Sequence, residues 1–143
     1  DIDKLLGSKA KWTPSVFEKL KSEMKPEEAA KVFPGMDKRD ELGFTKIDVK
    51  DNPGLWRYEF LYLGEDRDKL ASAEIHFDPK LTSDEFWNTL LTAMKKKYGE
   101  KYETISTRSL MWMSENIDTA ELSEDTDFES DDVRTFFVIK VML

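Results

Sequence analysis

The chain has 143 residues, of which 39% are hydrophobic and 36% are charged, with a formal net charge of −8 and a sequence pI of about 4.8. These values are typical of one soluble domain, and the acidic balance argues against nucleic acid or anionic lipid as the main ligand and favours a basic partner. The chain has no cysteine, which excludes disulfides, thiolate metal sites and cysteine nucleophiles, and no apolar run approaches the ~20 residues of a membrane span.

The first third of the chain predicts an arm followed by two short helices. Residues 1–12 predict a loosely held arm, with candidate anchors at Ile2, Leu5, Leu6 and Trp12. Thr13-Pro14 is typical of a helix start, and apolar residues follow it at helical spacing up to Met24. A second helix is expected from Pro26, which suits a first turn, and Pro34-Gly35 ends it.

The chain begins at Asp1 rather than at methionine. We therefore expect that an upstream segment has been removed, and we favour export over the choice of an expressed fragment. A signal peptide and a lipoprotein signal, which would place a lipid anchor upstream of Asp1, both remain open.

The segment Leu55–Leu63, LWRYEFLYL, predicts the central strand. Alternation places one row of side chains on one face, namely Trp56, Tyr58, Phe60 and Tyr62. The opposite row is Leu55, Arg57, Glu59, Leu61 and Leu63. Because each aromatic ring can bury roughly 150–250 Å², we expect the helices to cover the aromatic face.

Two neighbouring strands are expected beside it. Residues 44–50 alternate and are followed by the turn sequence of residues 51–54, so they predict a hairpin with the aromatic strand. Residues 70–77 predict the third strand. Its covered row is expected to be Ala71, Ala73, Ile75 and Phe77, and its other row Leu70, Ser72, Glu74 and His76.

The second half predicts one long helix and several strands. Thr82 and Glu85 have the spacing of a capping box, and Gly99 is a typical helix stop. The three lysines before Gly99 are expected to complement the helix dipole rather than to bind phosphate. Strands are predicted at residues 102–107, 109–114, 117–122 and 133–143.

This order predicts a single α+β domain spanning residues 1–143, with an antiparallel sheet and helices packed on one face. It divides into two small modules of a helix and three strands, at residues 13–79 and 80–143. Three segments resemble proteins of the beta-lactamase-inhibitory-protein-like fold, which is also used by a small lipoprotein of the bacterial outer-membrane assembly machinery. They are Met24 to Glu28 leading into Phe33-Pro34-Gly35, Lys69 to Phe77, and Lys97-Tyr98-Gly99. The resemblance implies an exported bacterial protein that contacts another protein; Lys25 stands where that family usually has glycine or threonine.

The residues that could carry catalysis are few. His76 is the only histidine, so a multi-histidine metal site is excluded, and a Ser-His-Asp site would have to use it. No nucleophile elbow, dinucleotide-binding glycine pattern or phosphate-binding loop is present. We therefore predict no enzyme activity and no cofactor, and a hydrolase built on His76 is the least favoured hypothesis.

The segment Glu115–Asp132 contains nine acidic residues and no basic one. A calcium loop starting at Asp125 would place Ser130 where glycine belongs and Phe136 where the bidentate glutamate belongs. A mobile acidic hairpin loop is therefore the expected structure, and cation binding remains open.

The remaining candidate site is the less apolar face of the sheet. Its residues are Lys46, Asp48, Arg57, Glu59, Ser72, Glu74 and His76. Mixed charges here are either simple cross-strand pairs or a shallow protein-docking surface. We expect a non-catalytic, extracytoplasmic protein-interaction module with a protein partner; the alternative is a carrier of a small apolar ligand or lipid that uses the aromatic strand as a pocket wall.

Overall fold

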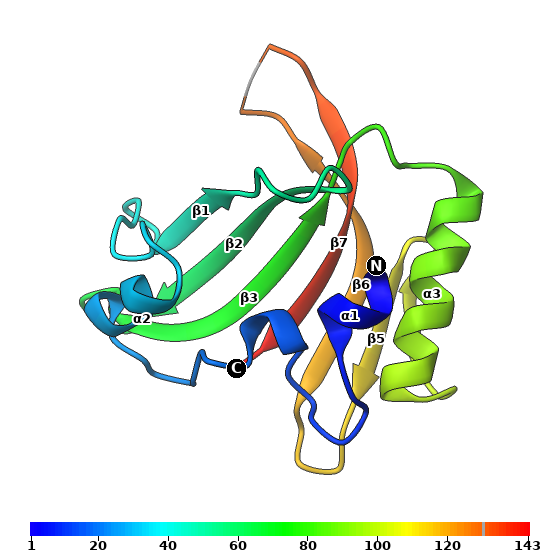
Figure 1. Ribbon diagram of the computed structural model, residues 1–143, viewed down its shortest axis with the longest axis horizontal. Coiled ribbons are helices and arrows are strands. Elements are labelled where there is room, and N and C mark those ends of the chain that lie inside the picture. The colour runs from blue at the N-terminus through cyan, green and yellow to red at the C-terminus, as the bar shows by residue number, and fades with distance from the viewer. Residues whose placement is uncertain (130) are drawn as a thin grey trace.

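The computed structural model describes residues 1–129 and 131–143 as an α+β fold built on one seven-stranded antiparallel sheet (Figure 1). The strand order is β1-β2-β3-β7-β6-β5-β4. The strands are β1 Phe44–Asp48, β2 Leu55–Leu63, β3 Lys69–Phe77, β4 Glu103–Ser106, β5 Ser109–Met113, β6 Thr119–Asp127 and β7 Arg134–Met142. The helices are α1 Ile2–Leu6, α2 Pro26–Val32 and α3 Asp84–Tyr98, with a short 3₁₀ helix, η1, at Ser15–Phe17.

The helices cover one face of the sheet, which we call the covered face; the other is the reverse face. Phe17 of η1 packs edge to face on Tyr58 and Phe60 of β2, with ring centroids 5.4 and 5.6 Å apart. Trp87 of α3 packs in the same way on Phe137 of β7 at 5.1 Å. Figure 1 shows α2 and α3 on the same side of the curved sheet. The prediction of an antiparallel sheet covered on one face is confirmed.

Local sequence signals predicted the first residue of each of the two longer helices to within one position. Helix α2 begins at Pro26 as predicted. Helix α3 begins one residue later than expected, because Ser83 rather than Thr82 is the N-cap and its Oγ accepts a hydrogen bond from the N–H of Phe86 at 3.1 Å. The helix ends at Gly99, whose φ of 106° suits glycine.

The amphipathic helix predicted after Pro14 is wrong, because only the three residues of η1 are helical. The chain instead turns at Glu23, with φ of 64°, and pairs with the start of β3. The N–H of Glu23 donates to the carbonyl of Leu70, and the N–H of Leu70 donates to the carbonyl of Met24.

The N-terminal arm is not loosely held. Leu6, the last residue of α1, is fully buried in the core. The ammonium of Lys97 donates to the carbonyls of Ser8 and Lys11 at 2.7 and 2.6 Å. The indole of Trp12 donates to the carbonyl of Thr119 at 3.2 Å. All four expected anchors hold the arm: Leu6 is in the core, and Ile2, Leu5 and Trp12 are partly buried against it.

One inserted residue changes which side chains of β2 face the helices. Leu55 lies opposite Phe77 and Arg57 lies opposite His76, so Trp56 is the extra residue of a β-bulge. Leu55 is buried on the covered face, whereas Trp56 packs on Phe136 of the reverse face. The prediction that Trp56 shares a face with the other three rings is therefore wrong.

A second irregularity lies between Leu61 and Tyr62. It pairs Tyr62 with Leu70 rather than with Ala71. Leu70 is fully buried and Ala71 is half-buried, so the expected facing of these two residues is also reversed.

Half of the acidic segment is strand rather than loop. Strand β6 runs to Asp127, which pairs with Arg134 of β7. Strand β7 pairs with β3 only as far as Val138, so the β6–β7 hairpin continues beyond the end of β3 and projects at the top of Figure 1. Ser130, which the calcium-loop comparison used, lies outside the described residues. None of the described helices has the length and apolar character needed to cross a bilayer.

Candidate functional site

The seven predicted site residues lie on adjacent positions of the reverse face. The register places Lys46 opposite Glu59, Glu59 opposite Glu74, and Arg57 between Asp48 and His76. Ser72 lies opposite Leu61 on the same face. However, Arg57, Ser72 and His76 are buried, so these three side chains are not open to a docking protein.

His76 is bonded through both ring nitrogens. The Nε–H of Arg57 donates to Nδ1 of His76 at 3.0 Å. Since a guanidinium in a protein always carries this hydrogen, Nδ1 must be the acceptor. The ring proton therefore sits on Nε2 and is donated to Oε1 of Glu74 at 2.8 Å. These two contacts define a neutral Nε2–H tautomer.

Two carboxylates face each other beside this histidine. Glu59 is directly opposite Glu74 in the register, and its Oε2 lies 4.0 Å from Nε2 of His76. Burial raises the pKa of Glu59, and the charge of Glu74 raises it further. The nearest ammonium is that of Lys46, 3.9 Å from Oε1 of Glu59, and its charge offsets part of this effect on the pKa.

The same residues hold the β6–β7 hairpin. Nη2 of Arg57 lies 3.7 Å from Oδ2 of Asp127, and the ammonium of Lys46 lies 2.8 Å from Oε2 of Glu129. Strands β3 and β7 lie between β2 and β6 in the sheet. In a flat sheet this separation would be about 14 Å. The end of the hairpin therefore bends across the reverse face.

Aromatic rings cover His76 at the base of the hairpin. Phe136 lies 4.7 Å from His76 and 5.0 Å from Trp56, measured between ring centroids. The guanidinium of Arg57 lies 3.7 Å from the Trp56 ring centroid, and that of Arg134 lies 5.5 Å from the same centroid. We refer to Arg57, Glu59, Glu74, His76, Trp56 and Phe136 as the reverse-face cluster.

Sequence reasoning missed the hairpin half of this arrangement. Asp127 contacts β2 across two intervening strands and Arg134 contacts it across one, which no local pattern shows. One signal was present, because alternation along residues 133–143 places Phe136 and Val138 in the same row as Arg134 and Lys140. Two large apolar residues on that face indicated that part of it is covered.

Three groups in the cluster have the right atoms for a metal site. Single ligand atoms of Glu59, Glu74 and His76 lie within 4.8 Å of one another. A metal-bound histidine normally donates its second ring N–H to an acceptor. Here the second nitrogen, Nδ1, faces the donor of Arg57 instead. The candidate ligands Glu59, Glu74 and His76, as arranged here, therefore do not fit a divalent metal.

The same contacts limit general-base chemistry. Both ring nitrogens of His76 are engaged, and the ring is almost completely buried. A substrate would have to displace Arg57 or Glu74 to reach either nitrogen. The arrangement is suited to holding strands and the hairpin together.

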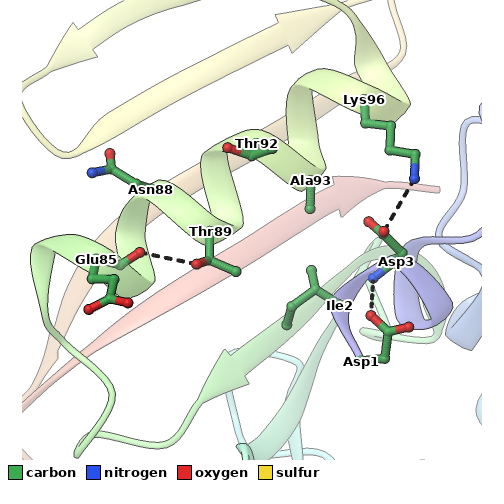
Figure 2. Close-up of a pocket in the computed structure, with 9 residues that line it drawn as sticks. All are labelled: Asp1, Ile2, Asp3, Glu85, Asn88, Thr89, Thr92, Ala93 and Lys96. Atoms are coloured by element: carbon green, nitrogen blue, oxygen red, sulfur yellow. Dashed lines mark hydrogen bonds and ion pairs between the residues drawn. The ribbon is translucent and has the colours of Figure 1, made fainter.

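An open groove of about 550 Å³ lies between α1 and α3 (Figure 2). Its polar side chains are largely engaged within the protein: the hydroxyl of Thr89 donates to the carbonyl of Glu85 at 3.1 Å, and Lys96 pairs with Asp3 at 3.3 Å. Figure 2 shows Asn88 pointing away from α1, so the polar groups of the groove do not converge on one point.

Comparison of the chain with protein-family models, with curated proteins and with solved structures gives no significant match.

Proposed function

We propose that this protein is a non-catalytic, extracytoplasmic protein-interaction module that contacts its partner through the tip of the β6–β7 hairpin. The observation that carries the proposal is the exposure of two large apolar side chains there: Phe128 is 75% exposed and Val133 is 62% exposed. Single exposed apolar residues are ordinary. Two of them at the end of a projecting, anchored hairpin are typical of contact residues.

The anchoring of the hairpin supports this proposal. Asp127 and Glu129, on either side of Phe128, pair with Arg57 and Lys46 of the reverse face. A segment that is already ordered loses less conformational entropy on binding than a free loop does. The buried members of the predicted docking face would therefore support the contact surface rather than form it.

The carrier hypothesis has weaker support. The rings of Phe17 and Phe33 lie 5.4 to 5.6 Å from those of Tyr58 and Phe60, so they occupy the space a ligand would need against β2. The hydroxyl of Tyr62 is buried without a hydrogen-bond partner among the described residues. One water molecule would satisfy it, so this hydroxyl does not require a ligand.

The strand order is consistent with two modules. Strands β1 to β3 come from the first half of the chain and β4 to β7 from the second, and the halves meet at β3 and β7. The second half has the four strands predicted at residues 102–107, 109–114, 117–122 and 133–143, rather than the three of a helix-plus-three-strand module. We propose on this basis, and on the resemblance described above, modules at residues 13–79 and 80–143 of one domain with the beta-lactamase-inhibitory-protein-like fold. Export rests on that resemblance, and a signal sequence in the complete reading frame would test it.

Site-specific photo-crosslinking tests the proposed contact. A benzophenone amino acid replaces Phe128 in the full chain expressed in its native cell, and a matched control carries it at Leu42, which is 64% exposed. We expect a discrete protein adduct from position 128 and none from position 42. Failure to form an adduct at 128, or the same adduct from both positions, would contradict the proposal.

A further inference from the structure

We infer that the partner surface which meets the hairpin tip has an apolar centre flanked by lysine and arginine side chains. This inference rests on the proposed function and specifies the chemistry of the partner. It follows from the acidic charges of the β6–β7 hairpin that have no ion pair among the described residues and from the apolar side chains exposed at Phe128 and Val133.

The fold neutralises only part of the acidic charge of the hairpin. Asp127 and Glu129 are paired with Arg57 and Lys46. Glu124, Asp125 and Asp131 are exposed and form no ion pair with another described residue. Arg57 and Lys46 are therefore engaged with Asp127 and Glu129, Arg134 of β7 lies opposite Asp127, and Glu124, Asp125 and Asp131 are left without an ion pair in the described part of the chain.

The apolar and acidic groups are arranged as in a protein-binding surface. Phe128 and Val133 supply the apolar contact, and a phenylalanine ring can bury roughly 150–250 Å² in all. Charged groups at the rim of an interface contribute to specificity and to the rate of association more than to affinity. A partner that buries Phe128 would lie beside the hairpin that carries these unpaired acids, which favours lysine and arginine around an apolar centre.

Charge argues against other occupants of this surface. A second copy would bring an equally acidic tip, and each chain carries a net charge of −8. Anionic membranes and nucleic acids would be repelled for the same reason. An uncharged bilayer remains a physical alternative for an exposed phenylalanine, and the experiment below includes it.

A random peptide library displayed on phage provides the probe. The full chain is the target, and the Phe128→Ala variant is used for counter-selection. We expect enriched peptides to combine an aromatic or branched aliphatic residue with at least two flanking lysines or arginines. Synthetic copies should bind the Phe128→Ala variant about tenfold or more weakly, as expected for an interface anchor. The matched Leu42→Ala variant should bind them as the wild type does.

The acidic rim is tested with the double variant Glu124→Gln, Asp125→Asn. It should bind the same peptides more weakly and with less dependence on salt concentration. Enrichment of peptides without basic residues, or equal binding to the Phe128→Ala variant, would overturn the inference. So would Phe128-dependent binding to phosphatidylcholine vesicles.

The two proposals fail separately. A protein adduct from position 128 together with selected peptides that lack basic residues would leave the module function standing and reject the basic partner. Basic peptides that bind at Phe128 without any adduct in the native cell would support the surface chemistry and contradict the proposed function.

Discussion

His76 illustrates how two neighbours can fix the chemistry of a buried side chain. Arg57 donates to Nδ1, and Glu74 accepts from Nε2. The histidine thus joins a cation and an anion on two adjacent strands. Its role in this arrangement is to connect β2 and β3 beneath the hairpin.

The tautomer of His76 can be measured directly, because it is the only histidine. In protein labelled with ¹⁵N in the imidazole, we expect the proton on Nε2 and the resonance of an unprotonated nitrogen for Nδ1 at neutral pH. Excess zinc should leave both resonances unchanged. A protonated Nδ1 in the neutral ring, or a zinc-induced shift of Nε2, would contradict the contacts described for Arg57.

Glu59 should reduce the stability of the fold at neutral pH. Burial and the charge of Glu74 raise its folded-state pKa above the ordinary value of 4.5. Its contribution to stability is therefore fully present below pH 4.5 and is lost as the pH rises through the raised pKa. Replacing it with neutral glutamine removes a like-charge pair across two strands, whose cost is about 0.2–1 kcal/mol.

The Glu59→Gln variant should consequently have a higher urea midpoint than the wild type at pH 7. The difference should shrink as the pH falls through the raised pKa toward 4.5. Glu103→Gln, at an exposed position of the sheet edge, serves as the control and should change little. A Glu59→Gln variant less stable than wild type at pH 7 would show that the pairing with Lys46 outweighs the repulsion.

At the scale of elements, the N-terminal segment depends on one lysine of α3. Lys97 is buried, and burial lowers the pKa of its ammonium. It nevertheless donates to two carbonyls, those of Ser8 and Lys11. The hydrogen bonds offset the cost of desolvating the charge.

The Lys97→Met variant should release the N-terminal segment, because it removes two hydrogen bonds from a charged donor, each worth about 1.5–3 kcal/mol. Faster proteolysis within residues 1–12 would report the release. Lys96→Met is a matched control, since Lys96 contacts the same segment only through an exposed pair with Asp3. Equal cleavage rates in the two variants would contradict this role.

The pH dependence of the same lysine has a defined sign. Its folded-state pKa lies below the ordinary value of 10.5, so the unfolded chain binds more protons between these two values. The wild type should therefore gain stability relative to Lys97→Met as the pH rises through this window. Urea denaturation of both proteins at several alkaline pH values would measure the gain.

Sequence reasoning succeeded where neighbouring residues decide the structure. Pro26, the capping-box signal of Thr82 and Glu85, Gly99 and the turn at residues 51–54 all act locally, and each was placed within a residue or two. The bulge at Trp56 was not predictable in this way. Its side chain turns to the reverse face, where Phe136 and Arg134 of the distant strand β7 pack against it.

The candidate site was predicted only in part, because some of its contacts also join distant segments of the chain. Alternation brought the seven residues to one face correctly. It did not show that the hairpin bends over them, because the contacts of Asp127 and Glu129 join segments about 70 to 80 residues apart in the chain. The exposure of Phe128 at the hairpin tip depends on that bend, so it could not be predicted from the sequence.

At the scale of the whole molecule, the two halves of the sheet are connected twice. They share the pairing of β3 with β7, and they are joined again where the hairpin of the second half contacts β1 and β2 of the first. The second connection depends on reverse-face side chains. The orientation of the exposed tip is therefore tied to the packing of the opposite half.

Hydrogen exchange in the Asp127→Asn variant tests this dependence most directly. The pair with Arg57 has side chains that are each 10% exposed, and its loss is expected to cost about 0.5–1 kcal/mol, which is about a two- to fivefold change. Amides of β6 and β7 beyond the end of β3 should exchange faster by this factor, while those of α3 and of the β2–β3 pair stay unchanged. The matched Asp125→Asn variant, which loses no ion pair, should exchange as the wild type does. Unchanged exchange in the hairpin of Asp127→Asn would contradict the claim that the reverse face holds it.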